Sequence, residues 1–103
     1  MRRRLCALAD LPEGAARVFE VDGVSLAAAR SATKVFVVEN RCSHDDGPLG
    51  QGRMFGTEIE CPRHGARFDI ATGQATRMPA VAPIETFATS IEGADVFVEM
   101  PEY

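Results

Sequence analysis

Cys42-Ser43-His44 and Cys61-Pro62-Arg63-His64 lie sixteen residues apart and contain both histidines of the chain and two of its three cysteines. Each segment combines one thiol with one imidazole, and glycines and prolines surround both segments. Metal sites need deprotonated ligands at a fixed geometry, and closely spaced ligand pairs on tight loops meet that need with little ordering cost. The spacing therefore predicts a metal centre with Cys42, His44, Cys61 and His64 as its ligands.

Two kinds of metal fit such a ligand set. A Cys2His2 site suits tetrahedral zinc and is common in structural zinc modules. Those modules, however, usually pair cysteine with cysteine and histidine with histidine. Mixed pairs make sense when the site holds two irons, because the two cysteines can share one iron and the two histidines the other. From the residues alone, zinc remains an alternative.

The rest of the chain has the pattern of a small β-protein. Turn signals are frequent, and no stretch of ten or more residues keeps a helical period. We expect an all-β fold, an antiparallel β-sandwich or small barrel, as a single domain over residues 1–103. Loops at about 41–53, 61–68 and 78–83 are expected to be set into it. The expected strands are 17–21, 26–32, 34–38, 57–60, 66–70, 84–91 and 95–98, the last two as a hairpin.

Composition excludes several classes of protein. The net charge of −4 argues against nucleic-acid binding, which needs basic surfaces to neutralise phosphates. After the arginines that open the chain, the apolar run Leu5–Ala9 is too short for an export signal or a membrane span. We therefore expect a cytoplasmic protein that contacts neither nucleic acid nor membrane. The remaining cysteine, Cys6, is expected to be a buried residue of the first strand rather than part of a disulfide.

The ligand segments and their surroundings together resemble the Rieske iron–sulfur proteins, whose signature is C-x-H followed by C-x2-H. The resemblance extends to the turn after the first ligand pair, the strand and turn after the second, and a proline-containing loop that covers the cluster. These are residues 45–50, 68–69, 72–73 and 78–83. The resemblance implies one Rieske-type 2Fe–2S cluster bound by Cys42, His44, Cys61 and His64, and it favours iron over zinc.

The numbers of cysteines and histidines distinguish between the classes of Rieske protein. Respiratory members carry a further cysteine in each cluster loop, joined as a disulfide, and a membrane anchor, whereas Cys6 is the only spare cysteine here. Catalytic oxygenase subunits need a second iron held by two histidines and a carboxylate. Both histidines of this chain are already assigned to the cluster. We therefore expect no catalytic residue and an electron-transfer role rather than an enzyme activity.

The resemblance is strongest to the ferredoxin components of multicomponent ring-hydroxylating oxygenases. It implies a monomeric one-electron carrier that takes electrons from a flavin-dependent reductase and passes them to a terminal non-haem iron oxygenase. An alternative is the small Rieske subunit of an assimilatory nitrite reductase. A second alternative, of another class, is a zinc-stabilised interaction module.

The residues near the ligands also predict the redox range. Two ferric irons, two sulfides, two thiolates and two neutral imidazoles sum to zero charge, so one-electron reduction gives −1. Rieske centres lie at roughly −150 to +300 mV, and hydroxyl donors to the cluster sulfurs raise the potential. High-potential relatives typically have Ser and Tyr where this chain has Ala66 and Phe68. The low end, near roughly −150 mV, is therefore expected.

Three charged residues of the loops each allow two interpretations. Asp45 and Asp46 either cap the turn or form a docking patch for a basic partner. Arg63 is expected to be exposed, and it either is simply solvated or steers a partner electrostatically. Four apolar residues are expected to shield the cluster and line the contact surface: Pro48, Leu49, Met78 and Pro79. Four aromatic residues are expected in the core: Phe36, Phe68, Phe87 and Phe97.

Overall fold

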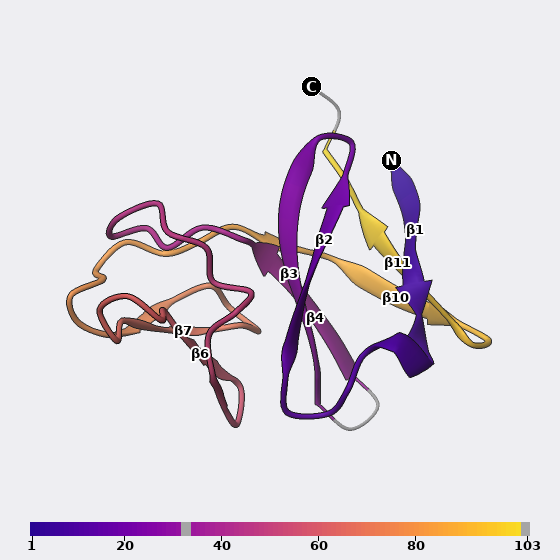
Figure 1. Cartoon of the computed structure of the whole chain (residues 1–103). Coiled ribbons are helices and arrows are strands. Elements are labelled where there is room, and N and C mark those ends of the chain that lie inside the picture. Colours follow the sequence, from indigo (N-terminus) through magenta and orange to yellow (C-terminus); the bar gives the residue numbers. More distant parts are fainter. Residues whose placement is uncertain (32–33, 102–103) are drawn as a thin grey trace.

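The computed structural model describes residues 1–31 and 34–101, and their strands form three antiparallel sheets (Figure 1). The first sheet has the order β1 (Arg2–Ala7), β11 (Asp95–Glu99) and β10 (Thr89–Glu92). The second has the order β2 (Ala16–Val21), β3 (Val24–Ser31), β4 (Lys34–Glu39) and β9 (Thr86–Phe87). The third has the order β5 (Met54–Phe55), β6 (Glu58–Glu60), β7 (Arg67–Asp69) and β8 (Ala75–Arg77).

This architecture confirms the predicted all-β antiparallel fold with an inserted loop subdomain. Within the two described ranges the one helical segment is a 3-10 turn at Leu8–Asp10. No helix among these residues is long and apolar enough to cross a membrane. Ala32, at the end of one expected strand, lies outside the described residues, as do the last two residues of the expected domain.

The second sheet separates two hydrophobic cores. Successive residues of a strand point to opposite faces, so one strand can serve both cores. In β3, Ala27 and Ala29 belong to the core that also contains the two cysteines of the predicted site, whereas Leu26 and Ala28 belong to the core shared with β1 and β11. We call these the cluster-side core and the basal core. β3 and β4 therefore form a common wall between the predicted metal site and the rest of the molecule.

The tight turn between β2 and β3 sets the register of that wall. Asp22 and Gly23 both have positive φ, at 52° and 79°, and the strands pair on either side of them as Val21 with Val24. Positive φ at both central residues is the geometry of the type I′ hairpin turn, which an Asp-Gly pair favours. The Asp22-Gly23 pair therefore accounts for the hairpin between β2 and β3.

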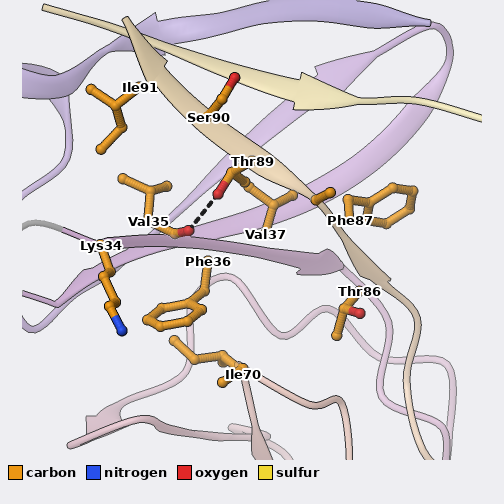
Figure 2. Close-up of a pocket in the computed structure, with 12 residues that line it drawn as sticks. Lys34, Val35, Phe36, Val37, Ile70, Thr86, Phe87, Thr89, Ser90 and Ile91 are labelled. Carbon is orange, nitrogen blue, oxygen red and sulfur yellow. Dashed lines mark hydrogen bonds between the residues drawn. The ribbon is translucent and has the colours of Figure 1, made fainter.

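The C-terminal hairpin differs from the prediction. Residues 84–91 do not form one strand: β9 pairs with β4 through Phe87 and Val37, whereas β10 pairs with β11. The chain thus passes from one sheet to the next at Ala88, and it leaves an open groove between β4 and β10 (Figure 2). Thr89 Oγ1 donates a hydrogen bond of 2.7 Å to the Val35 carbonyl across this groove (Figure 2).

Two short strands of the third sheet, β5 and β8, were not expected. The Phe55 ring of β5 lies 3.8 Å from the guanidinium carbon of Arg67 in β7, and Arg67 also pairs with Glu60 at 3.2 Å. Gly52 lies where the chain crosses β6, because a Cβ there would be 1.8 Å from the Glu60 carbonyl oxygen. Long-range contacts of this kind have no periodic sequence signal, which is why the prediction missed these strands.

The individual core predictions are mostly confirmed. Cys6 is buried in β1, and Phe68 and Phe87 are buried. Phe36 is only half-buried against the cluster-side core. Phe97 is half-buried as well, and the Arg2 guanidinium lies 3.9 Å from its ring centre. An alternating strand puts one residue in two on the outer face, and Phe97 is such a residue.

Candidate metal centre

The first ligand segment is a closed turn. The Cys42 N–H donates to the Gly47 carbonyl at 2.8 Å, and the Asp46 N–H donates to the Cys42 carbonyl at 2.8 Å. Asp46 adopts a positive φ of 61°, which an aspartate tolerates better than most residues. These bonds fix the backbone on both sides of His44.

The second ligand segment repeats this pattern. The Cys61 N–H donates to the Ala66 carbonyl at 2.6 Å, and the Gly65 N–H donates to the Cys61 carbonyl at 3.0 Å. Gly65 occupies the positive-φ position, with φ of 74°. In both turns the cysteine bonds to the residue five places on and accepts from the residue four places on. The two loops thus share one hydrogen-bonded turn around the cysteine, although the histidine follows the cysteine by two residues in the first loop and by three in the second.

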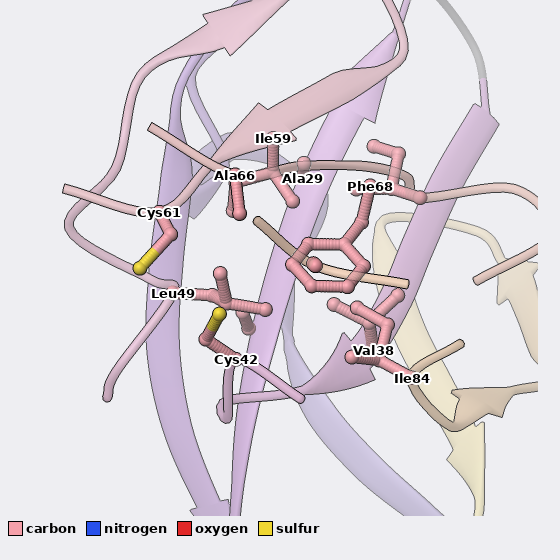
Figure 3. Packing of buried hydrophobic residues seen from close by; sticks show 12 residues of the cluster. Ala29, Val38, Cys42, Leu49, Ile59, Cys61, Ala66, Phe68 and Ile84 are labelled. Atoms are coloured by element: carbon pink, nitrogen blue, oxygen red, sulfur yellow. The ribbon is translucent and has the colours of Figure 1, made fainter. Parts of the chain in front are cut away.

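The two turns bring the four predicted ligands together in two layers. The sulfurs of Cys42 and Cys61 lie within 4.8 Å of each other, and so do ring nitrogens of His44 and His64. The two imidazole rings are perpendicular, with centres 5.3 Å apart. Both cysteines are fully buried in the cluster-side core, where Leu49 and Phe68 pack around them (Figure 3). Both histidines are exposed, so the thiol layer is internal and the imidazole layer faces solvent.

Asp45 lies between these two layers. A carboxylate oxygen of Asp45 is within 4.8 Å of the sulfur pair and of the imidazole pair. Its Oδ1 accepts the Gly47 N–H at 2.9 Å, which confirms the turn-capping interpretation of this residue. Its Oδ2 is buried without a hydrogen bond and lies 3.4 Å from His64 Nε2 and 3.5 Å from Arg63 Nε. The Gly47 N–H, and then the Arg63 charge, hold the pKa of the Asp45 carboxyl below its usual value.

Arg63 is exposed, as expected, and it crosses from the second loop to the first. A Cβ at position 47 would lie 2.8 Å from Arg63 Cδ, so the glycine leaves room for the arginine side chain to pass. Asp46 is exposed and forms an ion pair with Arg41. The charged residues of and beside the two ligand loops therefore form ion pairs with each other.

Two sets of side-chain to backbone hydrogen bonds that hold the site together were not predicted from the sequence. Asn40 Oδ1 accepts the N–H groups of Leu49 and Gly50, at 2.8 and 2.6 Å, and so ties the far end of the first loop to the end of β4. Ser43 Oγ donates to the Ala82 carbonyl at 2.6 Å and joins the first loop to the 78–83 loop. An asparagine before a loop is a general turn signal, and only the folded geometry shows which amides it caps.

One residue of the predicted contact surface is placed wrongly by the sequence analysis. Leu49 is fully buried in one core with the two cysteines, so it encloses them as a shielding residue would, but it cannot line a docking surface. Pro48, Met78 and Pro79 are exposed near the site as expected. A leucine between two turn residues can face either way, and its burial in the cluster-side core gains more free energy than exposure.

Comparison with known proteins identifies the family. The model of the Rieske [2Fe-2S] domain matches residues 2–88 of the chain. The chain belongs to the Rieske [2Fe-2S] family. The chain is 34% identical over 98 residues to the 3-phenylpropionate/cinnamic acid dioxygenase ferredoxin subunit of Shigella flexneri serotype 5b (strain 8401), with 94% of this chain and 92% of that protein covered.

Solved Rieske structures agree with this assignment. The ferredoxin of carbazole 1,9a-dioxygenase from Nocardioides aromaticivorans IC177 matches with a TM-score of 0.92 and 33% identity, covering 95% of this chain and 96% of that one. The Sphingomonas yanoikuyae B1 ferredoxin matches with a TM-score of 0.90 and 37% identity, covering 98% and 100%. A ferredoxin in complex with the oxygenase of carbazole 1,9a-dioxygenase is 30% identical. A putative nitrite reductase small subunit shares the fold, at 16% identity and a TM-score of 0.83.

Membership in the Rieske family makes the cofactor a 2Fe–2S cluster, in place of the zinc alternative. The residues present fit that group, because two thiols and two imidazoles converge in separate layers as two irons require. Burial raises the pKa of the Cys42 thiol, and an iron that binds it must displace that proton. A bound metal would therefore favour the thiolate form of Cys42.

Proposed function

We propose that Cys42 and Cys61 hold the inner iron of the cluster, that His44 and His64 hold the outer iron, and that the chain is a soluble one-electron carrier. It takes electrons from a flavin-dependent reductase and delivers them to a terminal non-haem iron oxygenase. The observation that carries this proposal is the difference in burial between the ligands. The thiols are enclosed, whereas the imidazoles are exposed, with the His64 side chain 50% accessible.

An electron therefore has one short route to a partner protein, through the imidazole edges. The bound cluster takes up and gives back one electron. The chain's own residues keep solvent from the inner iron: Leu49, Ala66 and Phe68 are each fully buried around the cysteines. Both histidines are used as ligands, so the chain supplies no histidine for a catalytic iron and itself performs no chemistry on an organic substrate.

The comparisons support the carrier over the nitrite-reductase subunit. Relatives at 33–37% identity are ferredoxins, and one ferredoxin that forms a complex with its oxygenase is 30% identical. The likeness to a nitrite reductase small subunit, at 16%, extends to the fold alone. We further propose that the chain is a single Rieske domain, monomeric, and located in the cytoplasm.

The ligand assignment is tested by single substitutions in the purified protein. Cys42→Ser, Cys61→Ser, His44→Ala and His64→Ala should each abolish or strongly alter the red-brown absorption and the EPR signal of the reduced cluster. Cys6→Ser is the matched control, since Cys6 lies in β1 within the basal core, and it should keep the full spectrum. A variant in the first group that retains the unmodified spectrum would remove its residue from the ligand set.

The carrier role is tested by reconstitution. The loaded protein should restore electron flow from a flavin-dependent reductase to a terminal oxygenase of the same organism, in proportion to its concentration. Copurification with a sirohaem protein, with no transfer to any oxygenase, would support the nitrite-reductase subunit instead. Absence of iron and acid-labile sulfide from anaerobically isolated protein would contradict both functions.

A further inference from the structure

The 78–83 loop exposes two large apolar side chains beside the predicted electron exit. Met78 is 76% exposed and Val81 is 81% exposed, the highest values among the large apolar residues of the described ranges. Solvent-exposed apolar groups at such levels gain free energy when a partner covers them. Pro79 and Pro83 restrict the backbone of this loop, so little conformational entropy is lost when a partner binds it.

The loop is fixed against the ligand layers rather than projecting freely. Ala80, between the two exposed residues, is buried in the cluster-side core together with Cys42 and Cys61. Ala82 accepts the hydrogen bond from Ser43, the residue between two ligands. Ala80 and Ala82 thus fix this loop against the first ligand segment, and we expect a partner that approaches the imidazoles to cover the exposed Met78 and Val81 as well.

The charge of this end of the molecule is balanced. Residues 41–83 contain five arginines and five acidic residues, whereas the rest of the chain contains six basic and ten acidic residues. The whole net charge of −4 thus lies outside the cluster-binding segment. Within that segment the charges also pair locally: Arg41 with Asp46, Arg63 with Asp45, Arg67 with Glu60, and Arg77 with Glu60. A strongly basic or acidic partner surface would find no complementary field here.

From this arrangement we propose that Met78 and Val81 form an apolar docking patch for the electron-accepting oxygenase, and that its contact surface is apolar and carries little net charge. This inference rests on the proposed carrier function. Docking through the patch depends on buried apolar area rather than on long-range attraction. Association should accordingly respond weakly to ionic strength.

The experiment measures the KM of the terminal oxygenase for the reduced ferredoxin, with reductase in excess, for the unmodified chain, Met78→Ser, Val81→Ser and the double variant. Each single substitution should raise KM about fivefold or more, with kcat little changed, as expected for a contact at the centre of a small interface. Ile91→Ser is the matched control, because Ile91 is an exposed apolar residue of β10 in the first sheet. It should leave KM unchanged.

Two further measurements separate docking from other effects. The reduction potential and EPR spectrum of each variant should match those of the unmodified chain, since neither side chain is a ligand. KM of the unmodified chain should change less than about threefold between roughly 0.01 M and 1 M salt, over which the Debye length falls from about 30 Å to 3 Å. A much steeper increase would show docking through charges and would overturn the proposal.

The remaining outcomes are also decisive. Transfer by the unmodified chain with unchanged KM in the double variant would overturn the docking patch and leave the carrier function intact. No transfer from the unmodified chain to any oxygenase would overturn both. Concentration-dependent dimerisation of the unmodified chain that the double variant loses, seen by sedimentation, would assign the patch to a second copy of the chain and contradict the proposal.

Discussion

The cluster end and the basal part of this molecule achieve order by different means. The basal part consists of long antiparallel strands, and β2, β3 and β4 pair along nearly their whole lengths. The cluster end consists of short strands and turns, held by individual side chains such as Asn40 and Asp45. Strand pairing is repetitive and tolerates the loss of one bond, whereas a loop closed by one side chain does not. The site is therefore the part most sensitive to single changes.

A shared wall connects the two regions. β3 and β4 supply alternate side chains to the cluster-side core and to the basal core. The basal sheets can thus stay folded while the loops vary, and the loops take their position from the end of β4. This division predicts that perturbations of the cluster end stay local, which four experiments can test.

Removal of the cluster should have the largest effect, and the effect should be confined to one side of the wall. On the proposed assignment, removal of the iron leaves the buried thiols of Cys42 and Cys61 without the metal that joins the two turns. Metal binding and folding of such a site are coupled. We expect amide hydrogen exchange in residues 42–47 and 61–66 to accelerate at least about tenfold, equivalent to about 1.4 kcal/mol of local stability. Exchange in β3 and β4 should change far less. Equal acceleration throughout the chain would show that the two cores unfold together.

Asn40→Ala should have the next largest effect, because it removes the hydrogen bonds that join the end of β4 to the first loop. The substitution leaves the N–H groups of Leu49 and Gly50 without their acceptor. An unsatisfied buried donor costs about 1–3 kcal/mol, so the midpoint of denaturant unfolding should fall and the cluster should be released faster. Asn40→Asp is the matched variant, since it keeps an acceptor oxygen and should retain most of the stability. Loss of stability in both variants alike would assign Asn40 a different role.

Ala66→Ser tests the cluster end alone. Ala66 is fully buried beside the cysteines, and a hydrogen bond to a charged group is worth roughly 1.5–3 kcal/mol, with 59 mV equal to about 1.4 kcal/mol for one electron. If the hydroxyl reaches a cluster sulfur, the potential should rise by tens of millivolts to about 100 mV, measured by voltammetry. Ala66→Val is the control for bulk without a donor. An unchanged potential in Ala66→Ser would show that this side chain does not point toward the cluster.

Substitution of Cys6 should have the smallest effect on the cluster, because Cys6 lies in the basal core, separated from the site by β3 and β4. Burial, and then the charge of Asp10, raise the pKa of the Cys6 thiol, so the folded chain favours the neutral form. The folded state therefore keeps its full stability below the unfolded-state thiol pKa of about 8.5, and the free energy of unfolding falls as the pH rises above it. Cys6→Ala should lessen that fall and leave the reduction potential unchanged. A shift in potential would contradict the insulation of the two regions.

The sequence predicted those features that depend on residues close together in the chain. The convergence of the four proposed ligand side chains, the β-class of the fold and the turn at Asp22-Gly23 follow from residue types at fixed spacing. Features that depend on contacts between distant segments were missed. Leu49 was assigned to the surface, residues 84–91 were assigned to one strand, and the capping role of Asn40 was not foreseen. Each of these depends on which distant backbone or core lies opposite, and spacing along the chain does not report that.

The pairing of β1 with β11 has a practical consequence. Arg2 lies opposite Glu99, and the backbone groups of Met1 and Met100 bond to each other, so both ends of the described chain emerge at the same end of two neighbouring strands. The loops that present His44 and His64 lie at the other side of the molecule (Figure 1). A peptide linker attached at either end could tether the protein to an electrode or to a reductase module while the imidazole face stays free to engage an acceptor.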